Sequence, residues 1–215
     1  MRKPIDLSLY LVTNSELTLG RSLLEVVEEA VKGGVTLVQL REKEASSLDF
    51  YREALAMKKL LAPYGVPLII NDRVDIALAV DADGLHIGQG DLPYAVARDL
   101  LGEDKIIGLS VENTQDVLIA NELDIDYIGI SPVFLTDTKQ DTASALGIEG
   151  ARAINKLSNK PSVGIGGIHL DNVADIIATG SEGVSVVSAI VSAPSPREAA
   201  QQLKEIIIKT KNNGE

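Results

Sequence analysis

An amide and two cations lie at the end of one apolar segment of the chain. In "TLVQLREKE", residues 36–44, they are Gln39, Arg41 and Lys43, spaced two residues apart. Because the side chains of an extended strand alternate between its two faces, these three would point in the same direction. Guanidinium and ammonium groups gathered at one place bind phosphate-type anions. The segment therefore predicts one wall of an anion site, whereas Glu42 points to the opposite face and is expected to be structural.

Two aspartates also follow short apolar runs, Asp72 in "IINDR" and Asp91 in "HIGQGD". Mg²⁺ is commonly held by one or two carboxylates together with water and substrate phosphates. A metal ion there, with the cations at residues 41 and 43, would neutralise a diphosphate leaving group. Each aspartate could instead cap the helix that follows it, which is the commonest role of Asp at such a place. Spacing alone leaves both interpretations open.

A glycine cluster near the end of the chain, "VGIGGIH", offers a second anion site. Glycine has no Cβ, so a phosphate can approach its backbone N–H groups closely. A tight turn would explain the cluster equally well, but its position one unit before "VVSAI" favours phosphate binding. Elsewhere, His86 lies within an apolar run and is expected to be a hydrogen-bonded core histidine.

The elements that must position these residues follow a repeated pattern. Short β-branched runs are followed by segments of helical periodicity, which predicts parallel strands covered by helices. Eight such units favour one closed (β/α)8 TIM barrel over residues 1–215, with a frayed tail at 209–215 and the chemistry at the carboxyl ends of the strands. The predicted strands are residues 9–13, 36–40, 67–71, 84–88, 106–110, 127–131, 162–166 and 184–190, and the predicted helices 21–34, 48–65, 92–102, 114–123, 171–180 and 195–210.

Composition narrows the class of partner. A net charge of -11 and 3% aromatic residues argue against a nucleic-acid or anionic membrane surface, but allow a small anionic substrate where cations gather. The chain has no cysteine, and no apolar run reaches the roughly 18 residues of a membrane span. We expect a cytoplasmic protein, for which a homo-oligomeric state is compatible with the sequence.

Seven segments, each at a predicted strand end, together resemble the thiamine-phosphate synthase family over nearly the whole chain. They are "VQLREK", "IINDR", "ADGLHIGQGD", "GLSVEN", "YIGISPVFLTDTK", "VGIGGIHLDN" and "GVSVVSAI", in the family's order. The resemblance implies a (β/α)8 barrel that joins a hydroxymethylpyrimidine diphosphate to a thiazole phosphate and releases pyrophosphate. Two positions depart from the family pattern: Gly90 replaces the usual acidic residue and Leu135 the usual proline, which we expect to affect affinity more than identity.

The resemblance also implies roles for individual residues. It places the pyrimidine diphosphate on Gln39, Leu40, Arg41, Glu42, Lys43, Asn71, Ser110 and Lys139, with Arg41, Lys43, Ser110 and Lys139 as the catalytic set. It places Mg²⁺ on Asp72 and Asp91, and the thiazole phosphate on Thr136, Thr138, Gly167, Val187 and Ser188.

A dissociative reaction would fit these residues, because it needs charge stabilisation and alignment rather than a strong general base. Two other functions stay open. A thiazole tautomerase-like barrel would need an acid/base residue and no metal, and a non-catalytic sensor of phosphorylated ligands would need no metal site.

Overall fold

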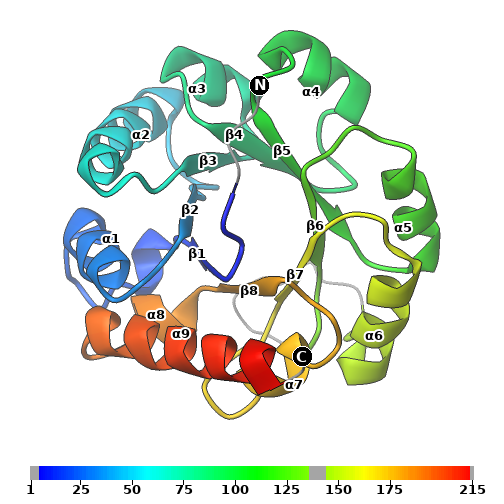
Figure 1. The fold of residues 1–215 in the computed structure, drawn as a ribbon. Helices are drawn as coiled ribbons and strands as arrows, with labels where there is room; N and C mark the ends of the chain where they lie inside the picture. The colour runs from blue at the N-terminus through cyan, green and yellow to red at the C-terminus, as the bar shows by residue number, and fades with distance from the viewer. Residues whose placement is uncertain (1–4, 136–143, 214–215) are drawn as a thin grey trace.

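The computed structural model describes residues 5–135 and 144–213. Its eight parallel strands form a closed barrel in chain order, with β8 pairing to β1, and helices surround it (Figure 1). The (β/α)8 prediction is therefore confirmed. The strands are β1 (Leu9–Val12), β2 (Leu37–Leu40), β3 (Leu68–Asn71), β4 (Gly84–Ile87), β5 (Ile106–Val111), β6 (Tyr127–Ile130), β7 (Ser162–Ile165) and β8 (Gly183–Val186).

The helices depart from the sequence prediction at several places. α3, α6 and α8 were not predicted; residues 188–190 belong to α8 instead of the last strand, and residues 209–213 continue α9 instead of fraying. The α-helices are α1 (Leu23–Lys32), α2 (Ser47–Leu61), α3 (Val74–Ala79), α4 (Tyr94–Leu101), α5 (Thr114–Asn121), α6 (Gly147–Leu157), α7 (Val173–Ile177), α8 (Ser188–Val191) and α9 (Pro196–Asn213), and the 3-10 helices η1 (Ser15–Leu17) and η2 (Ala62–Tyr64). Within the described residues, no helix is both long and apolar enough to cross a membrane.

The strands are apolar on both faces because two separate cores cover them. In β1, Leu9 and Leu11 join the large core between barrel and helices, whereas Tyr10 points into the barrel. The inner core fills the amino end of the barrel and includes Tyr10, Leu37, Ile69, Ile106, Tyr127 and Val163. The Tyr127 ring lies over Gly108, where any Cβ would collide with it. This packing closes one end, so a cavity can open only at the other.

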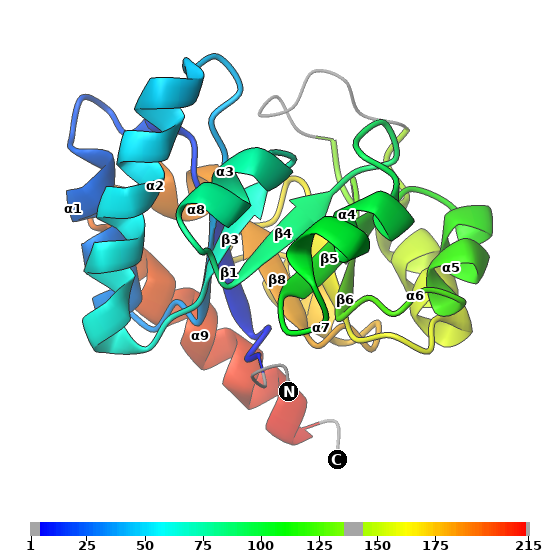
Figure 2. The same ribbon diagram turned by 90° about the horizontal axis from the view of Figure 1, so that it is seen from above.

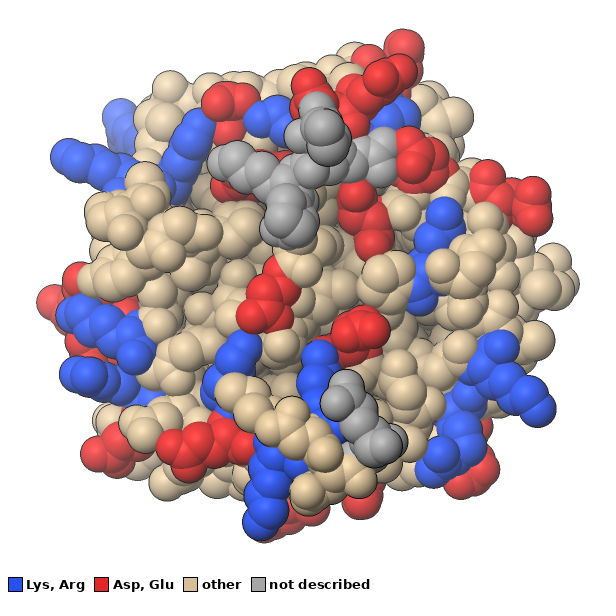
Figure 3. Space-filling model, viewed as in Figure 1, with Lys and Arg blue, Asp and Glu red and all other residues tan. Residues whose placement is uncertain are grey.

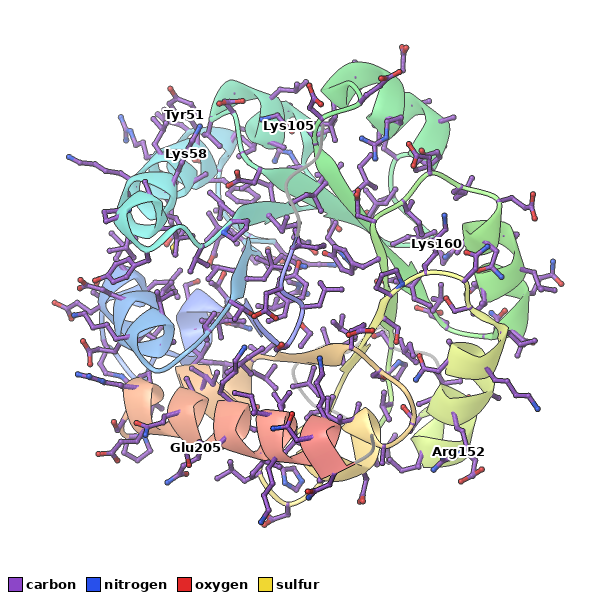
Figure 4. The ribbon with its side chains drawn as sticks, in the orientation of Figure 1. Tyr51, Lys58, Lys105, Arg152, Lys160 and Glu205 are labelled. Atoms are coloured by element: carbon purple, nitrogen blue, oxygen red, sulfur yellow. The ribbon has the colours of Figure 1, made fainter. Side chains whose placement is uncertain are left out.

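The amino end of the barrel carries both ends of the described chain and a surface of mixed charge. The described chain begins at the amino end of the barrel, and α9 ends there too (Figure 2). Figure 3 shows the face at this end, where basic and acidic residues are interspersed. Lys58 and Lys105 lie on the outer part of the molecule (Figure 4), and both bind the Asp81 carboxylate, at 3.0 Å and 2.5 Å. These two peripheral cations therefore share one carboxylate partner.

Closure of the barrel depends on Gly183, the first residue of β8. A Cβ at this position would collide with the carbonyl oxygen of Leu7 and lie 2.6 Å from that of Ser8. We therefore expect Gly183→Ala to lower the free energy of unfolding by about 1–3 kcal/mol, because the β8–β1 seam must shift. Urea denaturation would measure the loss. Gly90→Ala is the matched control, since a Cβ there meets nothing within 4 Å. Equal unfolding midpoints for the two variants would contradict the argument.

Candidate active site

A cavity of about 450 Å³ opens at the carboxyl ends of the strands. The side chains of Leu40 and Glu42 are not in its lining; Leu40 is fully buried in the core between barrel and helices. Thr136, Thr138 and Lys139 lie outside the described residues. The other predicted site residues all line this one cavity: Gln39, Arg41, Lys43, Asn71, Asp72, Asp91, Ser110, Gly167, Val187 and Ser188.

The carboxyl end of β2 supplies the cations of the cavity. The backbone N–H of Arg41 donates to the Thr13 hydroxyl at 3.0 Å, which ties this end of β2 to β1. Among the ion pairs found in the described part of the chain, none involves Arg41 or Lys43, in contrast to the paired Lys58 and Lys105. Two positive charges at the mouth of a cavity, neither within ion-pair distance of a carboxylate among the described residues, suit an anionic ligand.

Asp72 and Asp91 form a carboxylate pair at the ends of β3 and β4. Asp72 has φ 59°, a left-handed conformation that is uncommon outside glycine. Its pKa rises to about 6 because it is partly buried and faces the Asp91 carboxylate, although Lys43 and Asn71 act in the opposite direction. Burial and like charge together make this place unfavourable for two anions and favourable for a cation between them.

The helix-cap alternative for these aspartates is not what the structure shows. The N-caps of α3 and α4 are Arg73 and Pro93, and neither helix has a side-chain cap. Asp91 Oδ2 instead accepts a hydrogen bond from the backbone N–H of Gly88 at 2.7 Å, which closes its own loop. Across the described ranges, no group of three or more His, Cys, Asp or Glu is arranged to hold a metal. A metal at this pair would therefore need water and substrate oxygens as further ligands.

Glycines form the opposite wall of the cavity. Gly166 and Gly167, directly after β7, have φ 102° and 60°. A Cβ on Gly167 would lie 2.7 Å from the Leu135 carbonyl oxygen and 2.8 Å from Phe134 Cβ. Glycine is thus required both by the backbone conformation and by the close passage of the loop after β6. Val187 and Ser188, at the start of α8, complete this wall.

Several polar residues in the barrel interior were missed as site residues. His86, expected to be a hydrogen-bonded core histidine, does bind two hydroxyls, those of Tyr127 and Ser110, but it also lines the cavity. Tyr10 and Ser185 line it too. The signal for Tyr10 was its alternation with Leu9 and Leu11, which places it on the inner face once the strand is known to belong to a closed barrel.

Glu42 lies behind the anion wall, where it contacts η1. Its Oε2 accepts a hydrogen bond from the Ser15 hydroxyl at 2.9 Å. Burial raises the pKa of Glu42, and burial together with the Glu42 charge raises the pKa of Glu53 on α2 to about 7. These contacts support the structural role that we expected for the Glu42 side chain.

The raised pKa of Glu53 predicts a pH-dependent stability. Its ordinary value is 4.5, so ionisation of the folded protein as pH rises through about 7 removes stability that is present below 4.5. At pH 8 we expect Glu53→Gln to have a free energy of unfolding about 1 kcal/mol higher than that of the wild type, after allowance for solvent screening. Urea denaturation would measure this gain, which should shrink at pH 5. The exposed Glu44→Gln is the control. A gain from Glu53→Gln that is equal at both pH values would rule out this origin.

Known proteins resemble this chain in both sequence and structure. A family model described as thiamine monophosphate synthase matches residues 9–190. The thiamine-phosphate synthase of Syntrophomonas wolfei is 51% identical over 201 residues, covering 94% of this chain and 96% of its own. That of Albidiferax ferrireducens is 49% identical over 201 residues, covering 94% and 92%.

Solved structures also resemble this chain. Thiamine phosphate pyrophosphorylase from Pyrococcus furiosus has a TM-score of 0.88 at 36% identity, covering 95% of this chain and 97% of its own. Orotidine 5'-phosphate decarboxylase from Pyrococcus horikoshii, with a TM-score of 0.68 and 18% identity, covers 92% and 99% and shows a common fold alone. With a matching family model over most of its length and relatives about half identical to it, the chain belongs to the thiamine-phosphate synthase family.

Proposed function

We propose that the cavity couples a hydroxymethylpyrimidine diphosphate to a thiazole phosphate, giving thiamine phosphate and pyrophosphate. One wall would bind the diphosphate and the opposite wall the thiazole phosphate. The observation that carries this proposal is the presence, in one cavity, of two cations and a carboxylate pair on one side and a glycine wall on the other. A diphosphate and a second phosphate could thus be held facing one another. Membership of the family supports the same reaction.

The cations act on the leaving group. Arg41 and Lys43 would hold the diphosphate oxygens and stabilise the charge that develops as pyrophosphate departs. The Ser110 hydroxyl, at the end of β5, would donate to the same group, and Asn71 at the end of β3 lies beside it in the lining. Lys139, outside the described residues, is expected to add a third cation.

The carboxylate pair fits Mg²⁺. Asp72 and Asp91 are hard oxygen ligands whose mutual repulsion a divalent cation would relieve, and the diphosphate and water would complete its ligands. When bound, Mg²⁺ supplies further positive charge to the diphosphate. Because the two aspartates lie at neighbouring strand ends beside Lys43, the protein brings metal ligands and cation to the same anion.

The chemistry then needs alignment more than proton transfer. The C–O bond between the pyrimidine methylene and the diphosphate breaks, and its electron pair leaves with pyrophosphate. The thiazole nitrogen donates its lone pair to the resulting carbocation. Gly167, Val187 and Ser188 would hold the thiazole phosphate so that this nitrogen faces the methylene carbon. A general base is not required at any of these positions.

The direct test mixes both phosphorylated substrates with the protein, with and without Mg²⁺, and measures thiamine phosphate and pyrophosphate. We expect equal amounts of the two products, formed only when Mg²⁺ is present. Proton exchange on the thiazole phosphate without coupling would instead indicate a tautomerase. Binding of both substrates with no pyrophosphate released would indicate a sensor.

A further inference from the structure

A continuous chain of side-chain hydrogen bonds crosses the inside of the barrel. Gln39 Nε2 donates to the Tyr10 hydroxyl at 2.6 Å, and that hydroxyl lies 2.8 Å from the Tyr127 hydroxyl. The Tyr127 hydroxyl lies 3.0 Å from His86 Nδ1, and His86 Nε2 lies 2.9 Å from Ser110 Oγ. All but Ser110 are at least nine-tenths buried. The chain thus connects two residues of the proposed diphosphate wall through three residues to which that proposal gives no role.

The donors and acceptors of this chain can all be satisfied in one direction, which starts from the Gln39 amide. An amide nitrogen can only donate, so the Tyr10 oxygen accepts from Gln39 and the Tyr10 proton goes to Tyr127. Tyr127 has a single proton, which goes to His86 Nδ1. Burial raises the pKa of both tyrosines, so both hydroxyls keep their protons. A ring that accepts on Nδ1 in this way carries its proton on Nε2 and donates it to Ser110 Oγ.

The direction of the chain decides what Ser110 offers to a ligand. Since its oxygen accepts from His86, its own proton is left for an acceptor in the cavity. An anionic diphosphate is such an acceptor, and a hydrogen bond to a charged oxygen is stronger than a neutral one. In the reversed chain, Ser110 would donate to His86 and present only lone pairs to the anion.

We propose that Tyr10, Tyr127 and His86 are positioning residues that direct the Ser110 hydroxyl proton toward the diphosphate and fix the orientation of the Gln39 amide. This inference rests on the proposed function, because it assumes that the diphosphate binds at Ser110. It goes further by giving the interior residues one task and predicting which nitrogen of His86 is protonated.

The tautomer of His86 is open to direct measurement. The chain has only two histidines, His86 and the exposed His169, so His169→Gln assigns the nitrogen signals. In ¹⁵N-labelled metal-free protein we expect His86 to be protonated on Nε2 and unprotonated on Nδ1. In Tyr127→Phe, which removes the donor to Nδ1, the population protonated on Nδ1 should increase. A wild-type His86 protonated on Nδ1 would overturn the proposal, and this readout is independent of catalysis.

Kinetics test whether the chain acts through Ser110. Tyr127→Phe should lower kcat roughly tenfold with the KM for the thiazole phosphate unchanged, because one hydrogen bond to the leaving group is lost. Ser110→Ala should lower kcat at least as much. The double variant should lower kcat no more than Ser110→Ala alone. Losses that multiply in the double variant, or an unchanged kcat in Tyr127→Phe, would overturn the proposal.

Two controls keep these results interpretable. Tyr94→Phe removes a hydroxyl on α4, outside the cavity lining. Among the described residues, the hydrogen bond found for this hydroxyl is the one it accepts from Arg98 Nε at 3.5 Å, so kcat should stay unchanged. If Tyr127→Phe fails to fold, Tyr10→Phe tests the Gln39 end of the chain: it removes the hydroxyl that orients the Gln39 amide and should lower kcat, while Tyr127 still donates to His86 Nδ1. A wild type that releases no pyrophosphate would defeat the proposed function, whereas the nitrogen spectra would still decide the direction of the chain.

Discussion

Replacing Asp72 by Asn is expected to lower the rate of thiamine phosphate formation by roughly 10²-fold or more at saturating substrates. The proposed Mg²⁺ has only two carboxylate ligands, so the variant loses half of the protein's charge at that site. Part of the rate should return at high Mg²⁺, because Asn keeps one oxygen ligand. Initial rates measured over a series of Mg²⁺ concentrations would show both effects.

Asp75→Asn is the matched control for this prediction. Asp75 lies three residues further on, in the first turn of α3, where it is exposed and paired with Arg73 at 2.6 Å. Its replacement should leave the rate near that of the wild type. In Asp72→Asn the free energy of unfolding of the metal-free protein should not fall, because the repulsion from Asp91 is removed. A variant with near wild-type rate and Mg²⁺ dependence would refute the metal site.

Arg41→Ala should have an effect of similar size, a loss of roughly 10²-fold in kcat/KM for the pyrimidine diphosphate. The guanidinium is half-buried at the end of β2 and forms no ion pair with the described residues, so its charge is available to the leaving group. Arg41→Lys should recover only part of the rate, because an ammonium cannot form two parallel hydrogen bonds to a phosphate. The KM for the thiazole phosphate should change little.

Arg52→Ala, on the exposed side of α2, controls for the loss of one positive charge from an acidic protein. Its only ion pair among the described residues is a long contact to Asp49, 3.8 Å, and it lies outside the cavity lining. If Arg52→Ala were as slow as Arg41→Ala, long-range attraction of the substrate would explain both, and the specific role of Arg41 would be wrong. Rates at raised salt would distinguish these causes, because screening weakens the long-range effect.

The sequence predicted the barrel well because burial on both faces leaves a continuous apolar signal in every strand. It was weaker for short helices. α3 has six residues and no side-chain cap, and α6 contains Gly147 and Gly150 after a long polar segment, so neither has a clear start signal. The end of β8 was placed too late because "VVSAI" is apolar in α8 as well as in the strand, and composition cannot tell the two apart.

The same contrast holds for the site. Residues in the last positions of strands or directly after them could be predicted, because the carboxyl ends of parallel strands meet at one rim. The tyrosines inside the barrel could not, since Tyr10 and Tyr127 look like ordinary strand residues until closure brings their hydroxyls to 2.8 Å. Their joint role depends on a distance between segments far apart in the chain, which no local pattern encodes.

Because Gly108 has no Cβ, its neighbours restrict which substitutions this barrel can tolerate during evolution. The Tyr127 ring occupies the space that a Cβ at residue 108 would need, and a Cβ at Gly129 would lie 3.3 Å from His86 Cε1. Substitution at residue 108 is therefore tolerable only together with a smaller residue at 127, and a large residue at 129 only with a change at 86. Such positions should mutate in pairs, so libraries that randomise one member alone should yield few functional clones.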